Sequence, residues 1–344
     1  MKYLYICIAV VLAALITGVS ITGMATKNTQ EPLIGALLSL SGANAGFGEN
    51  LRKGLELGLE NSHQLVIEDT QSNTRNAVSA AQKLIAAGAD ILLTEYSEDS
   101  YAVIEVAEQY GVPVVCIACG SVGTTEKSEL LYSTWPSDAI ETAALAEYAD
   151  SYEHIGIIQT ESIWENTLSE SFKEQSNAQI THMQTLRDTK SFQTELLRIQ
   201  NTDIIYAPVY EQRYPLLFKQ AKELGIDAQI MTTSWINEPN ILQACASVCE
   251  GAIVPQYAKP NEAFVKQYEE MYGEKPGTAA DIAYDTGLLI NAYLDQEEPF
   301  RVFMQDIQIQ GATGTLSFDA TGARMHRDVN LYVIQNQKLV EIQK

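Results

Sequence analysis

The chain has 344 residues, of which 46% are hydrophobic and 19% charged, so it is long enough for two lobes and too apolar for a disordered protein. Its formal net charge of −22 disfavours nucleic acid or an anionic membrane surface as a partner. The same charge fits a soluble, self-repelling protein outside the cytoplasm, although acidic proteins are also common in the cytosol.

The N-terminal segment carries no charge between Lys2 and Lys27. Residues 1–25 are therefore either a secretory signal, with Gly23-Met24-Ala25 as a small-x-small cleavage site, or an uncleaved membrane anchor. Cys7 lies too early in the apolar run to be a lipid-modified cysteine at a cleavage site. In both cases we expect the rest of the chain at the periplasmic or extracellular face of the membrane.

The first predicted element is an apolar strand, Leu33 to Leu38, followed by a glycine-spaced loop and a helix with leucines four apart. Strand, glycine loop and helix are also the parts of a nucleotide-binding loop. However, Gly42, Gly46 and Gly48 fit neither G-x-G-x-x-G nor G-x-x-x-x-G-K-[ST]. The loop therefore predicts a small-ligand contact or a plain turn, with an anionic group favoured at the helix N-terminus, and we expect no cofactor.

The chain then alternates between apolar strands and amphipathic helices that end at glycine. The pattern predicts strands at 64–69, 89–96 and 112–118, with helices at 73–88 and 99–111. Continuously apolar strands separated by such helices indicate βαβ units with a buried parallel sheet.

The alternation of apolar strands and amphipathic helices begins again after residue 153. It predicts strands at 154–160, 203–209 and 228–234, with helices at 161–175 and 215–225. Two further helical stretches, 262–273 and 279–294, precede a β-rich end with turn signals at Thr321-Gly322 and Asn336. The fold class is therefore α/β, with two doubly wound parallel-sheet lobes.

Four further cysteines fall into two close pairs. Cys116 and Cys119 form a C-x-x-C at the end of a predicted strand, and Cys245 and Cys249 are four apart on a predicted helix. We interpret them as small buried residues or local disulfides; a four-cysteine metal site and redox chemistry remain alternatives.

Candidate binding residues lie where strands end, because ligands of such sheets bind at the carboxyl ends of the strands and between lobes. In the first lobe these loops are 41–47, 95–100 and 119–124. In the second lobe they are 162–164, 210–213 and 234–238.

Taken in order, several stretches resemble the type I periplasmic binding proteins of the branched-chain amino-acid group, the solute receptors of ABC importers. They include "IGALLSLSGANAGFGENLRKGLELGLE", "GVPVVCIACGS", "YSTWPSDAIETAALAEYA" and "GTLSFDATGARMH". The resemblance implies two lobes joined by three crossovers, which close around one small solute without chemistry. It implies lobe 1 at 32–136 plus 258–325, and lobe 2 at 137–257 plus 326–344.

The resemblance also implies roles for individual residues. Phe47 stands where an aromatic packs over the ligand, and Ser97 or Ser100 offers a hydroxyl to a ligand carboxylate. After the fourth strand, backbone groups near Ala118 and the hydroxyl of Ser121 replace the usual serine and threonine. The second-lobe contacts are Trp164, Tyr210, Trp235 and Glu238.

The family's carboxylate that binds the amine of an amino acid has no counterpart at the matching position of this sequence. Relatives place a carboxylate after the fourth strand of the second lobe, where this chain has Ser234 and Trp235. Glu238, Asp281 and Asp285 are acids that can approach the crevice. A buried cation without a carboxylate is costly, so an organic acid, an amide or an aromatic acid is an alternative to an amino acid.

Simpler interpretations stand beside these roles. The tryptophans can be core residues, the serines helix caps, Asp281 a helix-surface residue and Glu238 a first-turn acid. Rival functions are a sensory ectodomain with a separate membrane signalling partner, and a serine hydrolase built on Ser121. We expect a monomeric, non-enzymatic binding protein without a metal, whose partners are a small solute and ABC permease subunits.

Overall fold

The computed structural model describes residues 31–59, 63–186, 190–296 and 298–343, and the predicted export segment lies outside them. Within the described part, no helix is both long enough and apolar enough to span a bilayer. The strands form two large sheets and one small hairpin.

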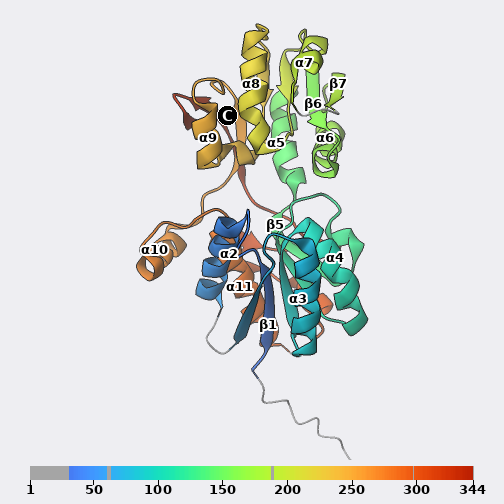
Figure 1. Cartoon of the computed structure of the whole chain (residues 1–344), viewed down its shortest axis with the longest axis vertical. Helices are drawn as coiled ribbons and strands as arrows, with labels where there is room; N and C mark the ends of the chain where they lie inside the picture. The colour runs from blue at the N-terminus through green and yellow to red at the C-terminus, as the bar shows by residue number, and fades with distance from the viewer. Residues whose placement is uncertain (1–30, 60–62, 187–189, 297, 344) are drawn as a thin grey trace, which may run out of the picture. The chain divides into compact units, whose positions relative to one another are not determined.

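The first lobe is built on a six-stranded parallel sheet. Its strands are, in spatial order, β13 (Ala323–Arg324), β5 (Leu131–Pro136), β4 (Val114–Ala118), β3 (Ile91–Tyr96), β1 (Leu33–Leu38) and β2 (Gln64–Asp69). One face is covered by α2 (Ala45–Gly58), α11 (Ala280–Leu294) and α12 (Phe300–Asp306), and the other by α3 (Thr74–Ala86) and α4 (Ser97–Ala107) (Figure 1).

The β1 strand shows why both faces are covered. Ile34, Ala36 and Leu38 pack into the core under α2 and α11, whereas Leu33 and Leu37 pack under α3 and α4. Because successive side chains of a strand point to opposite faces, a fully apolar strand needs helices on both sides.

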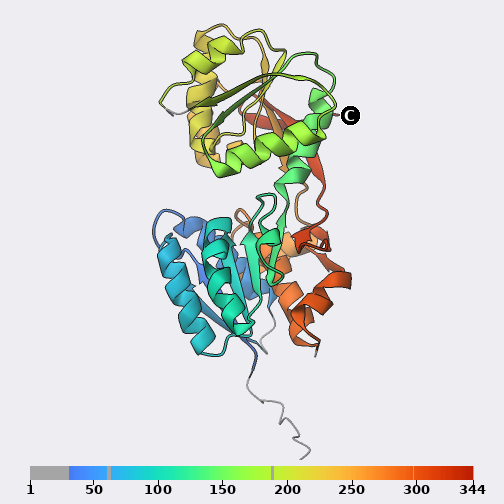
Figure 2. The same ribbon diagram turned by 90° about the vertical axis from the view of Figure 1, so that its right-hand side faces the viewer.

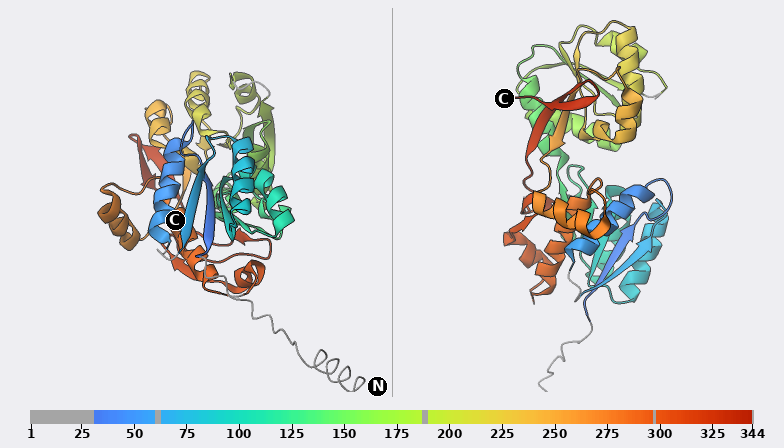
Figure 3. Two further views of the ribbon diagram at one scale, coloured as in Figure 1. Left: turned by 60° about the horizontal axis from the view of Figure 1, so that its bottom comes forward. Right: turned by 90° about the vertical axis from the view of Figure 1, so that its left-hand side faces the viewer.

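The second lobe is built on a seven-stranded mixed sheet. Its parallel part runs β10 (Ile253–Tyr257), β9 (Gln229–Met231), β8 (Ile204–Tyr206), β6 (Ile155–Thr160), β7 (Ile180–Leu186). An antiparallel hairpin, β14 (Val329–Gln335) and β15 (Lys338–Glu341), adds to the free edge of β10 (Figure 3). Helices α5 (Asp138–Ala149) and α6 (Ile163–Gln175) cover one face. Helices α7 (Gln193–Arg198), α8 (Tyr214–Glu223) and α9 (Pro239–Cys245) cover the other.

Three segments carry the chain between the two sheets. They lie between β5 and α5, between β10 and α10 (Glu262–Tyr272), and between β13 and β14, and can be followed in Figure 2 by their green, orange and red colours. A short hairpin of β11 (Ile309–Gly311) and β12 (Gly314–Leu316) precedes the last crossover. This arrangement confirms the predicted α/β fold class of two parallel-sheet lobes joined by a three-segment hinge.

The cysteines form two local disulfides, Cys116–Cys119 and Cys245–Cys249. The prediction of local bridges is confirmed, and the alternative of a shared four-cysteine metal site is wrong, because the pairs belong to different lobes and each is already bridged. No group of three metal-ligating side chains is present among the described residues.

Candidate functional site

The first group of candidate residues lies at the carboxyl ends of β1, β3 and β4. The ring of Phe47, in the first turn of α2, stacks on Tyr96 with centroids 5.4 Å apart. Ser97 begins α4, is 8% exposed, and its hydroxyl lies 3.5 Å from that of Thr124. These residues line up along the edge of the sheet where the fold places ligands.

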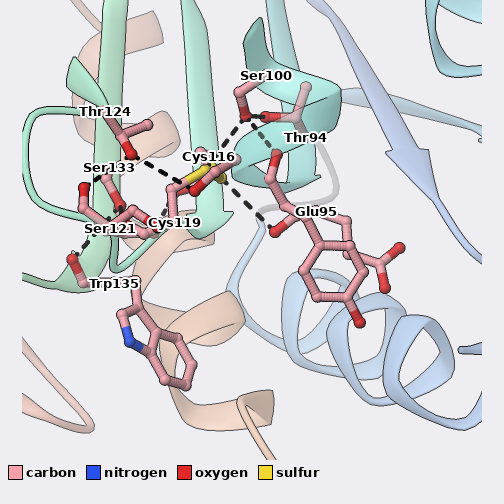
Figure 4. Close-up of a disulfide and its surroundings, with 12 residues drawn as sticks. Thr94, Glu95, Ser100, Cys116, Cys119, Ser121, Thr124, Ser133 and Trp135 are labelled. Atoms are coloured by element: carbon pink, nitrogen blue, oxygen red, sulfur yellow. Dashed lines mark hydrogen bonds between the residues drawn. A yellow bond between two sulfur atoms is a disulfide. The ribbon is translucent and has the colours of Figure 1, made fainter. Parts of the chain in front are cut away.

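Ser100 has an internal role in this structure. Its side chain is fully buried, and its hydroxyl lies 2.6 Å from that of Thr94 and 3.3 Å from the Cys119 sulfur (Figure 4). It also donates to the carbonyl of Tyr96. Through these hydrogen bonds Ser100 connects α4 to β3 and to the residue that follows β4.

The Cys116–Cys119 disulfide shapes the loop after β4, which carries Ala118 and Ser121. The carbonyl of Cys119 accepts a hydrogen bond of 2.8 Å from the Ser133 hydroxyl on β5 (Figure 4). Ala118 is half-buried at the end of β4, opposite Tyr96 in the ladder. Ser121 lines a cavity of about 360 Å³, whose other walls include Thr124, Ser137, Asp319, Arg324 and Met325.

A second cavity brings three of the candidate residues together. It has a volume of about 390 Å³ and is lined by Trp235, Glu238 and Asp281. Its wall also includes Trp135 and Tyr257, at the ends of β5 and β10 where two crossovers begin, and Arg327 in the third crossover. Trp135 and Trp235 stack with centroids 5.7 Å apart, and Tyr257 meets Trp135 edge-on at 6.2 Å. We call this space the crossover cavity.

The acids considered for an amine are engaged within the protein. Asp281 pairs with Arg327 at 2.8 Å, and Glu238 accepts a hydrogen bond of 3.1 Å from the Thr278 hydroxyl. Asp285 is fully buried and accepts backbone hydrogen bonds from Ala312 and Thr313. Asp281 is therefore a buried residue in the first turn of α11, paired with Arg327 of the third crossover, and the interpretation as a helix-surface residue is wrong.

The remaining candidates, Trp164 and Tyr210, lie together in the second lobe. Their ring centroids are 5.1 Å apart, and the Arg213 guanidinium lies 5.5 Å from the centre of the Tyr210 ring. Arg213 pairs with the fully buried Glu165 at 2.9 Å. Glu165 also accepts the backbone N–H of Tyr210, so the start of α6 holds this aromatic pair in place.

Sequence reasoning missed two acids that join these groups. Asp138 and Glu141 lie in the first turn of α5, and they are only 7% and 4% exposed. Asp138 accepts a hydrogen bond of 2.9 Å from the Trp164 indole, and Glu141 accepts one of 3.0 Å from the backbone N–H of Ser234. Burial raises the pKa of Asp138 to about 6, and burial together with the charge of Asp138 raises the pKa of Glu141 to about 8.

The position of these acids gave one signal in the sequence. Two of the three carboxylates of α5 stand in its first turn, separated by two residues from the stretch "LYSTW". First-turn acids are ordinary complements of a helix dipole, however, and only the structure shows that these two are buried.

The candidate residues thus form three groups. Phe47, Ser97, Ala118 and Ser121 belong to the first lobe edge, Trp164 and Tyr210 to the second lobe, and Trp235, Glu238 and Asp281 to the crossover cavity.

Two residues link these groups. Trp135 borders both cavities. Asp138 contacts Trp164 and donates its backbone N–H to the carbonyl of Gly120 in the β4 loop. Such an arrangement, aromatic and largely buried with a few convergent polar groups, suits a small ligand.

Comparison with known proteins identifies the family of the chain. Residues 33–338 match the family model described as periplasmic binding protein. No curated protein sequence matches the chain.

Several solved structures share the fold. The branched-chain amino acid transporter substrate-binding protein LivJ from Streptococcus pneumoniae, in complex with isoleucine, is 22% identical with a TM-score of 0.74, over 91% of this chain and 100% of that one. The leucine-binding protein LivK from Thermotoga maritima is 21% identical with a TM-score of 0.75, over 91% and 98%. An ABC transporter solute-binding protein from R. palustris, in complex with benzoate, is 18% identical with a TM-score of 0.72, over 91% and 96%.

Proposed function

The chain belongs to the periplasmic binding protein family, and we propose that it captures a small polar solute between its two lobes and delivers it to an ABC importer. The solute is an amino acid, an amide or an organic acid. It is released unaltered, because the protein acts by hinge closure and not by chemistry.

The crossover cavity is the observation that carries this proposal. Its wall includes Trp135 at the end of β5 and Tyr257 at the end of β10, where two crossovers begin, and Arg327 within the third crossover. A solute held there touches the parts of the chain about which two lobes turn, so binding favours one hinge state over another. The volume of about 390 Å³ lies within the range of ligand pockets.

We assign the solute contacts to the wall of this cavity and to one surface on each lobe. Trp235 and Glu238 lie in the cavity wall, while Trp164 and Tyr210 form the second-lobe surface and Phe47, Ser97, Ala118 and Ser121 the first-lobe surface. The lobes themselves are proposed as 32–136 plus 258–325 and 137–257 plus 326–344. Asp281 holds Arg327 in place at the third crossover.

The structures that share the fold support both solute classes. LivJ holds isoleucine and the R. palustris protein holds benzoate, and both are described as parts of transporters. We therefore propose ABC permease subunits as the partner of this chain. We also propose an extracytoplasmic location and a monomeric state.

A thermal-shift screen of amino acids, amides and organic acids tests this function. We expect at least one compound to raise Tm by mass action, since a ligand that binds only the folded state stabilises it. Mass spectrometry of the mixture after incubation should recover that compound unchanged. A protein that ignores every compound, or that converts one of them, contradicts the proposal.

Tyr210→Ala tests the assigned second-lobe contact. Tyr210 is 38% exposed, so its removal should leave the Tm of the unliganded protein nearly unchanged while reducing the ligand-induced shift strongly. Tyr110→Ala is the matched control, because Tyr110 is 66% exposed and lies at the far end of α4 from the candidate loops. An undiminished shift in Tyr210→Ala removes this residue from the site.

A further inference from the structure

The Cys116–Cys119 disulfide lies at the end of an inner strand of the first lobe. Cys116 belongs to β4, which pairs with β3 on one side and β5 on the other, and Cys119 is the first residue after β4 (Figure 4). Both side chains are buried. The bond therefore ties the start of residues 119–124, which we call the β4 loop, to a strand that is hydrogen-bonded on both sides.

The β4 loop carries a group that the proposed function assigns to the solute. Ser121 belongs to the proposed first-lobe surface, and Ser121 and Cys119 both line the cavity of about 360 Å³. Only Gly120 separates these two residues in the chain. A displacement of Cys119 therefore also moves the Ser121 hydroxyl.

The backbone of this loop receives little support from the sheet. In the part of the chain that the structure describes, the backbone N–H groups of residues 119–123 have no backbone acceptor. The loop is held instead through Cys119, whose carbonyl accepts a hydrogen bond of 2.8 Å from the Ser133 hydroxyl and whose sulfur lies 3.3 Å from the Ser100 hydroxyl. The covalent bond thus takes over a constraint that ladder hydrogen bonds supply in a strand.

The β4 loop also packs against the start of the first crossover. The backbone N–H of Asp138 donates to the carbonyl of Gly120 at 2.8 Å. A Cβ atom on Gly120 would overlap a carboxylate oxygen of Asp138 and would lie 2.9 Å from the Trp135 ring. Because no space separates these groups, a shift of the loop must displace Trp135 or Asp138. The disulfide therefore constrains both the proposed solute surface and its contact with the hinge.

We propose that the Cys116–Cys119 disulfide is a positioning element of the solute site, so that solute affinity depends on whether this bond is closed or reduced. With the bond closed, the β4 loop is already ordered when a solute arrives. With the bond open, binding must also order the loop, and that ordering costs affinity. The inference rests on the proposed function, since it names how the same site is regulated.

A dithiol is the class of reductant that opens such a bond. Cys119 lines the cavity of about 360 Å³ and Cys116 does not, so a thiolate of the dithiol attacks the Cys119 sulfur and displaces the Cys116 thiolate. The second thiol of the reductant then resolves the mixed disulfide and releases Cys119. Two electrons and two protons pass to the two cysteines, and the dithiol becomes a disulfide.

The second disulfide of the chain is a matched control. Cys245–Cys249 has a sequence separation of 4, against 3 for Cys116–Cys119, and its side chains are also buried. It packs in the apolar core of the second lobe and lines neither of the two cavities described above. Since loops of similar length constrain the unfolded chain to a similar degree, removal of either bond should lower Tm alike.

Isothermal titration calorimetry on folded protein tests the proposal with isoleucine, with benzoate and with the compounds that raise Tm in the thermal-shift screen. It compares wild type with Cys116→Ala/Cys119→Ala and Cys245→Ala/Cys249→Ala; alanine avoids a buried hydroxyl. We expect Cys116→Ala/Cys119→Ala to bind about tenfold more weakly than wild type, because ordering a single loop residue costs affinity of this size. The variant Cys245→Ala/Cys249→Ala should bind like wild type.

Reduced protein tests the dependence on thiols. Each protein is unfolded in urea with dithiothreitol and refolded in its presence, and alkylation with iodoacetamide followed by peptide mass spectrometry identifies the open bonds. Reduction should weaken binding in wild type and in Cys245→Ala/Cys249→Ala, and reoxidation should restore it. Dithiothreitol should not change the affinity of Cys116→Ala/Cys119→Ala.

Hydrogen exchange without solute gives a readout that does not depend on refolding of the reduced protein. The backbone N–H groups of the β4 loop should exchange faster in Cys116→Ala/Cys119→Ala than in wild type, and at the wild-type rate in Cys245→Ala/Cys249→Ala. Unchanged exchange in the first variant contradicts the positioning role.

The outcomes separate this inference from the proposed function. Equal affinity of wild type and Cys116→Ala/Cys119→Ala, or an equal loss in both double variants, overturns the positioning role while solute binding stands. An effect of dithiothreitol that persists in Cys116→Ala/Cys119→Ala also overturns it. If no compound binds to wild type, both proposals fall.

Discussion

At the scale of single residues, the buried acids of this protein are stabilised in different ways. Glu165 has Arg213, and Asp281 has Arg327. Asp285 instead accepts hydrogen bonds from Thr313 and the neighbouring backbone. Asp138 and Glu141, like the buried Glu95 and Asp99, have no ion pair among the described residues, and burial raises the pKa of these carboxyls.

This difference predicts a pH dependence of stability in the unliganded protein. A carboxyl whose pKa is higher in the folded state than in the unfolded state holds its proton mainly in the folded state, so stability falls as pH rises between the two values. For Glu141 this window runs from about 4.5 to about 8. The free energy of unfolding of Glu141→Gln minus that of wild type should therefore increase from pH 5 to pH 8.5, by at least about 1.4 kcal/mol, the equivalent of one pKa unit.

Urea denaturation at a series of pH values measures this difference. Glu147→Gln provides the comparison, because it removes one exposed charge from the same helix. Parallel pH curves for wild type and Glu141→Gln would mean that Glu141 does not titrate in the window.

Loops with aromatic residues were predictable at this scale, whereas the buried acids were not. The rule that ligands bind at strand ends led to Tyr210 and Trp235, and the structure places Trp235 in the crossover cavity. An acid in the first turn of a helix looks the same in a sequence whether it faces water or the protein interior. The burial of Asp138 depends on Gly120 and Trp164, which lie far from it in the chain.

At the scale of elements, apolar strands and glycine-ended helices were the easiest to predict. The predicted strand at 64–69 has the bounds of β2, and the helices predicted at 73–88 and 161–175 differ from α3 and α6 by one or two residues at an end. The sequence pattern does not predict strand β5 or helix α5, since "LYSTWP" mixes polar and apolar residues. Its polar side chains face other elements and not water: Thr134 bonds Thr286 of α11.

Helix α2 offers a test of how closely the elements pack. A Cβ atom on Gly58 would lie 2.3 Å from the backbone oxygen of Tyr284 on α11, so Gly58→Ala must push the two helices apart. We expect a destabilisation of about 1–3 kcal/mol in urea denaturation. The matched control is Gly46→Ala in the same helix, where a Cβ meets nothing within 4 Å, and which should stabilise by about 0.5–1 kcal/mol. Equal effects of the two substitutions would contradict a close α2–α11 contact.

At the scale of the whole molecule, the alternation of strands and helices predicted two doubly wound lobes without knowledge of any contact. The three crossovers came from the family resemblance, because local patterns do not say which lobe a later segment joins. The short strand β13 illustrates this limit: Ala323 pairs with Ser133, nearly two hundred residues earlier in the chain. The β14–β15 hairpin joins the other sheet only four residues after β13 ends.

The positions of the tryptophans predict how a hinge motion can be observed. The chain has three, Trp135, Trp164 and Trp235, and all of them lie at the crossover cavity or at the second-lobe aromatic pair. A solute that moves the lobes must alter the Trp135–Trp235 stack, because Trp135 belongs to the proposed lobe 1 and Trp235 to lobe 2. We therefore expect a saturable change in intrinsic fluorescence with any compound that raises Tm, at the same midpoint as in isothermal titration calorimetry.

The variant Trp235→Phe should retain binding but show a smaller change in fluorescence, because one partner of the stack is lost. A compound that binds by calorimetry but leaves the emission of all three tryptophans unchanged would place the solute away from the crossovers and exclude closure about them.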